Sequence, residues 1–179
     1  MTTLVLTIIG NDRPGLVDSL ARVVADHGGN WMESRMAHLG GKFAGILRVA
    51  VAAERADALV AALGKLDAEG LRVVGEADAV DVVPARFLPY RLELLGNDRP
   101  GIVREISHAL AERSVNVEDF RTECLDAPMS GGQLFRATAQ LRLPRDQDVE
   151  DLRRQLEQIA HDLMVDISLS EPSSDGPST

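Results

Sequence analysis

The hexapeptide Gly-Asn-Asp-Arg-Pro-Gly occupies residues 10–15 of this chain and returns unchanged at residues 96–101. Aligning residues 10–39 with residues 96–125 without a gap gives 11 identities in 30. A chance hexapeptide would not keep its register through the segment that follows it. We therefore interpret the chain as two copies of one domain, because internal repetition decides the fold before any other feature.

Each copy predicts the order strand, helix, strand, strand, helix, strand, from apolar alternation and from apolar residues at helical spacing. The expected strands are residues 4–9, 31–39, 43–53 and 71–83 in the first copy, and 88–95, 115–125, 133–143 and 163–169 in the second. We expect the first helix of each copy to begin at Pro14 or Pro100, since proline needs no N–H partner in the first turn.

This pattern predicts an α+β fold of two tandem ferredoxin-like (βαββαβ) domains, each a four-stranded antiparallel sheet with two helices on one face. The expected domains span residues 1–84 and 88–170. Residues 171–179 are rich in Ser, Pro, Asp and Gly, which predicts a disordered tail. The fold itself does not fix a function, because this arrangement hosts many unrelated ones.

The net charge of −9 argues against direct binding of nucleic acid, which needs clustered Lys and Arg to replace counterions. The densest basic group is Arg142, Arg145, Arg153 and Arg154, and neighbouring acidic residues dilute it. We interpret it as a solvated helix face. Aromatic residues make up only 3% of the chain, so base-stacking platforms are not expected either.

No apolar run is long enough to span a bilayer, and the chain enters a strand-like segment directly. The single Cys124 fits a reducing compartment, so we expect a cytoplasmic protein, with Cys124 as a small buried hydrophobe. The four histidines are scattered and lack metal-ligand spacing. The sequence therefore predicts no metal site, no cofactor and no catalytic residues.

The repeated hexapeptide connects the first strand to the first helix of each copy. Free N–H groups at the start of a helix attract an anion such as a carboxylate, and glycine lets a ligand approach the backbone. Carboxylates and amides nearby could hold an ammonium group. The candidate binding residues are Asn11, Asp12, Gly15, Leu16 and Asn30 in the first copy, and Asn97, Asp98, Gly101, Ile102 and Asn116 in the second. Asn30 and Asn116 are expected to enter the second strand beside this loop.

The same residues also have a purely structural interpretation. An Asp or Asn ahead of a helix is most often a cap, and glycine relieves crowding where a strand meets a helix. The two copies also differ around the loop, since Trp31 is replaced by Val117 in the second copy. One of the two sites could therefore be degenerate, and the sequence does not say which.

Asp12 to Leu16 with Asn30, and Asp98 to Ile102 with Asn116, resemble the signature of the ACT domain, a small ligand-binding regulatory module. Two such domains with little else resemble the glycine cleavage system transcriptional repressor family. The resemblance implies amino-acid binding at interfaces between domains, near this loop.

These features lead to the hypothesis of a non-catalytic regulatory protein that senses an amino acid, such as glycine or serine, and acts through a partner protein. A homodimer is expected, with no direct contact to nucleic acid or membrane. Transcriptional control of glycine and one-carbon metabolism would fit the resemblance. The alternatives are a regulatory subunit acting in trans on an amino-acid metabolic enzyme, and an interaction module whose ligand sites are empty.

Overall fold

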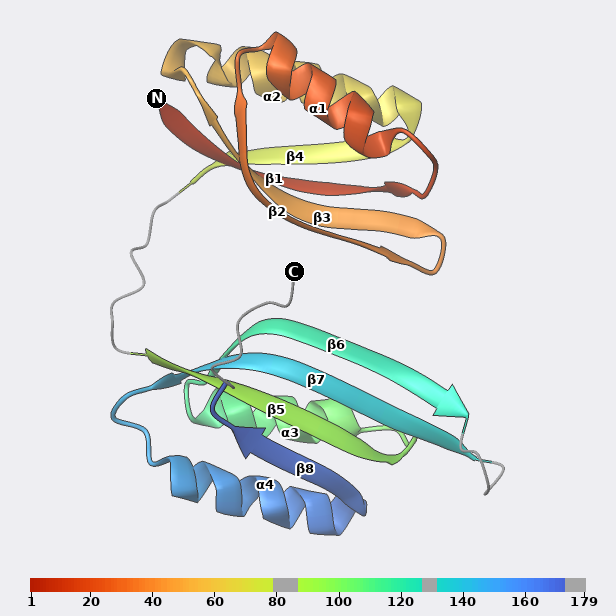
Figure 1. Cartoon of the computed structure of the whole chain (residues 1–179), viewed down its shortest axis with the longest axis vertical. Helices are drawn as coiled ribbons and strands as arrows, with labels where there is room; N and C mark the ends of the chain where they lie inside the picture. Colours follow the sequence, from red (N-terminus) through yellow and green to blue (C-terminus); the bar gives the residue numbers. More distant parts are fainter. Residues whose placement is uncertain (79–86, 127–131, 173–179) are drawn as a thin grey trace. The chain divides into compact units, whose positions relative to one another are not determined.

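The computed structural model describes residues 1–78, 87–126 and 132–172. The chain divides into two compact units, residues 1–81 and 82–179, which are described separately below. Both units carry the same order of strands and α-helices and the same type of sheet (Figure 1).

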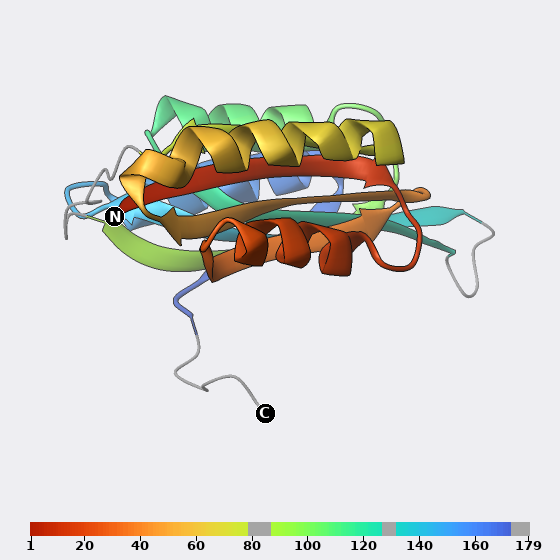
Figure 2. The same ribbon diagram turned by 90° about the horizontal axis from the view of Figure 1, so that it is seen from above.

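The first unit has four strands, two α-helices and two short 3₁₀ segments. These are β1 (Thr2–Asn11), α1 (Leu16–Asp26), β2 (Asn30–Leu39), β3 (Lys42–Val51), η1 (Ala53–Arg55), α2 (Ala56–Gly64), η2 (Lys65–Glu69) and β4 (Leu71–Ala77). The sheet is antiparallel, with the strand order β2-β3-β1-β4. Both α-helices lie on one face of it (Figure 2).

The second unit repeats this arrangement in the order β6-β7-β5-β8. Its elements are β5 (Phe87–Asn97), α3 (Ile102–Glu112), β6 (Asn116–Asp126), β7 (Gln133–Pro144), α4 (Val149–Leu163) and β8 (Val165–Ser170). The predicted fold class, two tandem ferredoxin-like α+β domains, is therefore confirmed.

Each unit has its own hydrophobic core between the sheet and the helices. In the first unit, alternate residues of the central strands, such as Leu6 and Leu47, pack against Leu20 of α1 and Leu59 of α2. In the second unit, the same layer contains Leu92, Leu141, Ile106 and Leu152, among others. Strand residues that point away from the helices form an open face on each sheet, because successive side chains of a strand point to opposite faces.

Two sequence predictions about helix ends are wrong. Helix α1 begins at Leu16 and not at Pro14, because Gly15 precedes it with φ 90° and holds Pro14 in a turn. Residue Leu163, expected to start the last strand, is the last residue of α4. Met164 then adopts a left-handed conformation that ends the helix, and β8 begins one residue later.

Some predictions fall on residues that the structure does not describe. The expected strand over 71–83 is observed as β4 up to Ala77, and residues 79–86, which include the expected domain boundary, lie outside the described part. Residues 127–131, between β6 and β7, and residues 173–179 of the expected tail also lie outside the described part.

Candidate functional site

The two hexapeptide loops have the same backbone conformation. The Asp12 N–H donates to the Gly41 carbonyl over 2.9 Å, and the Asp98 N–H donates to the Gln133 carbonyl over 2.8 Å. Each loop is thereby tied to the strand hairpin beside it. Gly15 has φ 90° and Gly101 has φ 100°, a region that other residues rarely adopt.

The arginine of each loop holds it to the end of the second helical segment. Arg13 Nη2 donates to the Glu69 carbonyl over 3.0 Å, and Arg99 Nη2 donates to the Asp162 carbonyl over 3.0 Å. A guanidinium can satisfy a carbonyl at a helical end, where intrahelical partners run out. This role of the arginine was not predicted from the sequence, although its presence in both copies was a signal for it.

The expected caps are absent. Neither α1 nor α3 has a side-chain hydrogen bond at its N-terminus, so Asp12 and Asp98 do not act as N-caps. A Cβ added at Gly15 or Gly101 would meet no atom within 4 Å. The first-turn N–H groups of both helices therefore lack a capping side chain and lie beside open space, where an anion can be accepted.

In the first copy, neighbouring side chains engage the loop. The Asp12 carboxylate lies 3.5 Å from Nδ1 of His38, and Lys42 Nζ donates to the side-chain oxygen of Asn11. His38 and Lys42 come from the β2–β3 hairpin, which covers one side of the loop. These two residues contact the candidate site and were not predicted as part of it.

In the second copy, Asn97 and Asp98 are exposed. Within the described residues, the side chains of Asn97 and Asp98 have no hydrogen-bond or ion-pair partner. A hollow of about 420 Å³ adjoins this loop. Its lining combines the loop, the first turn of α3 and the end of α4, through Arg99, Pro100, Gly101, Glu105, Ile159, Asp162 and Leu163.

The structure does not bring Asn30 or Asn116 to the loop of its own domain. Asn30 pairs with Ala50, which pairs in turn with Thr3 at the start of β1. The loop follows Asn11 at the other end of β1, eight residues or about 27 Å away. Asn116 has the equivalent place, opposite Arg142. The expectation was wrong because β2 runs parallel to β1 and begins at the far end of the sheet.

Leu16 and Ile102 belong to the cores, with exposed fractions of 3% and 2%. Their side chains pack against the sheets, so they can serve a ligand only through their backbone N–H groups. The remaining candidates, Asn11, Asp12 and Gly15 with their counterparts Asn97, Asp98 and Gly101, are exposed in the two loops.

The prediction that Cys124 is buried is wrong, since its side chain is exposed. Cys124 lies on the edge strand β6, opposite Phe135, where the helices do not cover the sheet. It occupies the register that His38, opposite Phe43, occupies in the first copy. Among the described residues, no group of three or more His, Cys, Asp or Glu is placed to hold a metal ion.

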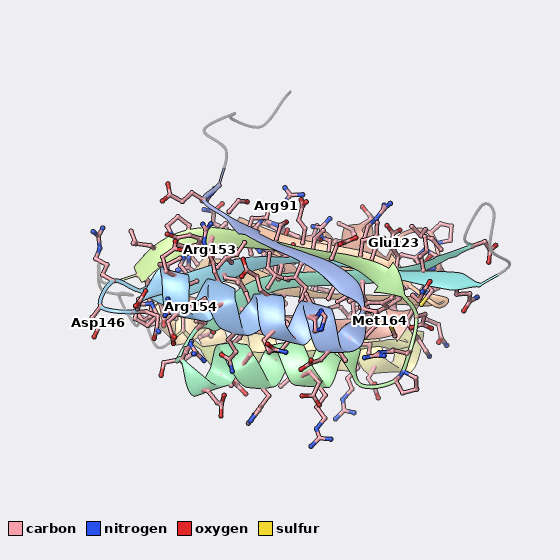
Figure 3. The ribbon with its side chains drawn as sticks, turned by 90° about the horizontal axis from the view of Figure 1, so that it is seen from below. Arg91, Glu123, Asp146, Arg153, Arg154 and Met164 are labelled. Atoms are coloured by element: carbon pink, nitrogen blue, oxygen red, sulfur yellow. The ribbon has the colours of Figure 1, made fainter. Side chains whose placement is uncertain are left out.

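The basic group near the start of α4 is largely neutralised. Arg142 pairs with Glu118 over 2.8 Å, Arg153 with Glu150 over 3.6 Å, and Arg154 with Asp151 over 3.2 Å. Figure 3 shows Arg153 and Arg154 on α4, with the acidic Asp146 in the turn before it. This arrangement of paired charges does not form a basic stripe that could follow a phosphate backbone.

Residues 2–74 and 92–170 each match the family model of the ACT domain. The chain belongs to the ACT domain family. Because the matches cover both copies, it is a tandem ACT-domain protein. No helix in the described segments is long and apolar enough to cross a membrane.

Known proteins similar to this chain cover either one copy or both. A UPF0237 protein of Methanopyrus kandleri is 39% identical over 91 residues, which is 51% of this chain and 94% of that protein. The crystal structure of an unknown protein from Galdieria sulphuraria has a TM-score of 0.83 and 29% identity, covering 96% of this chain and 98% of the other. A crystal structure named for the glycine cleavage system transcriptional repressor has a TM-score of 0.70 and 19% identity, covering 94% and 96%, and shows the same fold.

Proposed function

We propose that this chain is a cytoplasmic, non-catalytic regulator. It binds an amino acid at its second hexapeptide loop, and a partner protein recognises the ligand-bound state. The observation that carries the proposal is the difference between the two loops. Within the described residues, the carboxylate of Asp98 has no hydrogen-bond or ion-pair partner, whereas that of Asp12 lies 3.5 Å from Nδ1 of His38.

The chemistry of the second loop suits a zwitterion. The N–H groups that open α3 would receive the ligand carboxylate. The guanidinium of Arg99, whose Nη2 donates to the Asp162 carbonyl, lies on the same loop and has further N–H groups to offer. The carboxylate of Glu105, in the lining of the hollow, and that of Asp98, exposed in the loop, would receive the ammonium group. Ile159 and Leu163 provide an apolar wall for a small side chain, so glycine, serine and small aliphatic amino acids are the first candidates.

We further propose that the regulator works as a homodimer. Asn30 and Asn116 lie at the opposite end of the sheet from the loop of their own domain. If either amide contributes to a ligand site, it does so with the loop of another domain, which a second copy of the chain can supply. Ligand binding would then favour one arrangement of subunits over another, provided that its affinity differs between the two.

A thermal-shift screen of the full chain against the twenty amino acids tests the proposal. A ligand present at about 100 times its dissociation constant stabilises the folded state by about 2.7 kcal/mol. We expect glycine, serine or a small aliphatic amino acid to raise the melting temperature. If no amino acid does so at millimolar concentration, the chain is an interaction module with empty sites.

A further inference from the structure

The hollow beside the second hexapeptide loop has a carboxylate in its lining that the helix itself does not require. Asp162 belongs to the last turn of α4, whose residues Ile159 and Leu163 line the same hollow. Figure 3 shows Met164, the residue that ends this helix. A negative charge in the last turn of a helix is unfavourable, because the carbonyl end of the helix dipole is itself negative. The stability of α4 therefore does not account for Asp162.

The contacts of Asp162 leave one of its side-chain oxygens available. Its Oδ1 accepts a hydrogen bond from Nε2 of Gln158 over 2.9 Å, one turn earlier in α4. This bond holds the carboxylate against the surface of the helix. The backbone carbonyl of Asp162, and not its carboxylate, receives the hydrogen bond from Arg99. Within the described residues, Oδ2 of Asp162 has no hydrogen-bond or ion-pair partner.

The first copy provides an internal comparison for this carboxylate. There, Arg13 donates to the backbone carbonyl of Glu69 and also lies 3.7 Å from its carboxylate. The carboxylate beside the first loop is thus paired with the arginine of that loop. The carboxylate of Asp162 makes no such pair with Arg99 and is held by a neutral amide instead. The second copy therefore offers, beside its loop, a carboxylate oxygen that the first copy engages internally.

We propose that Asp162 selects the side chain of the amino acid bound at the second loop and that it favours a hydroxyl amino acid such as serine. With the ligand carboxylate at the start of α3 and the ammonium group at Glu105, the ligand side chain would face Asp162 and the apolar wall beside it. A carboxylate oxygen accepts a hydrogen bond from a hydroxyl group, and a site that does so discriminates against the analogue without the hydroxyl. The same oxygen repels a second carboxylate, so aspartate and glutamate would be disfavoured.

This inference rests on the proposed function, since it concerns the ligand of the same loop. The test is calorimetric titration of the full chain with serine, alanine and aspartate. We expect serine to bind about fivefold more tightly than alanine, which lacks only the hydroxyl group, and aspartate to bind more weakly than alanine. In Asp162→Ala, serine should bind like alanine and aspartate more tightly than it binds the wild type, while the affinity for alanine stays unchanged. A loss of structure would instead weaken the binding of all three ligands together.

Two further variants separate charge from hydrogen bonding and supply the control. Asp162→Asn removes the charge but keeps a hydrogen-bonding side chain, so it should retain the preference for serine over alanine and bind aspartate more tightly than the wild type does. Glu157→Ala removes a carboxylate from the same helix outside the lining of the hollow and should change none of the three affinities.

The outcomes distinguish this inference from the proposed function. Equal affinities of the wild type for serine and alanine, or a preference for serine that survives in Asp162→Ala, would overturn the selection by Asp162 alone. The same holds if other amino acids bind but none of these three does. A chain that binds no amino acid would overturn the proposed function and this inference with it.

Discussion

Nη2 of Arg99 lies 3.0 Å from the carbonyl oxygen of Asp162, and this hydrogen bond joins the second hexapeptide loop to the last turn of α4. Arg13 makes the same bond to Glu69 in the first copy. The arginine of the repeated motif therefore positions the loop in both domains. In the second copy, it also forms part of the wall of the hollow beside Gly101.

We expect Arg99→Ala to lower the free energy of unfolding by about 1 kcal/mol, because the Asp162 carbonyl loses a charged donor at an exposed site. Urea unfolding measures this loss. Arg13→Ala should cost a similar amount, but only Arg99→Ala should also weaken amino-acid binding. Equal effects of both variants on binding would contradict the assignment of the site to the second loop.

We expect Gly101→Ala to destabilise the protein by about 1 kcal/mol, because a residue with a Cβ is strained at φ 100° even though the surrounding space is open. Gly64 is the control, since it ends α2 with a negative φ and also has open space around it. Gly64→Ala should be neutral or stabilising by up to about 1 kcal/mol. Chemical denaturation of both variants checks the pair, and a stabilising Gly101→Ala would show that the left-handed conformation is not required.

The hydrogen bond from Arg113 lowers the pKa of Asp151, and a second one from Arg154 acts in the same direction. A lowered folded-state pKa means that the contribution of Asp151 is present above its unfolded pKa of about 3.9. It is lost as the pH falls through the folded-state pKa. We expect Asp151→Asn to be less stable than the wild type at pH 7 and the difference to shrink toward pH 2. If the stability difference between the wild type and Asp151→Asn grew as the pH fell, the predicted direction of the pKa shift would be contradicted.

The purified chain should not shift DNA in a gel at about 100 mM salt, because Arg142, Arg153 and Arg154 of its densest basic group are paired with carboxylates and its net charge is −9. Specific binding by the isolated chain, lost on changing Arg153 and Arg154 to Ala, would overturn this prediction. It would also overturn the view that any role in transcription passes through a partner.

The repeat and its apolar spacing were sufficient to predict the fold, because each core residue follows the period of its strand or helix. The site was less predictable. The place of Asn30 depends on the register of three strands. His38 contacts Asp12, which lies 26 positions earlier in the chain, and Arg13 contacts Glu69, which lies 56 positions later. Cys124 was misassigned because sequence does not show that the helices leave an edge strand uncovered.

Calorimetric titration of three proteins tests the central claim most directly: the wild type, Asp98→Ala and Asp12→Ala. The titrant is the amino acid that gives the largest thermal shift. The account predicts that Asp98→Ala weakens binding at least about tenfold, as expected when a charged hydrogen-bonding partner is removed, while Asp12→Ala binds like the wild type. Wild-type affinity in Asp98→Ala, or loss of binding in Asp12→Ala alone, would contradict it.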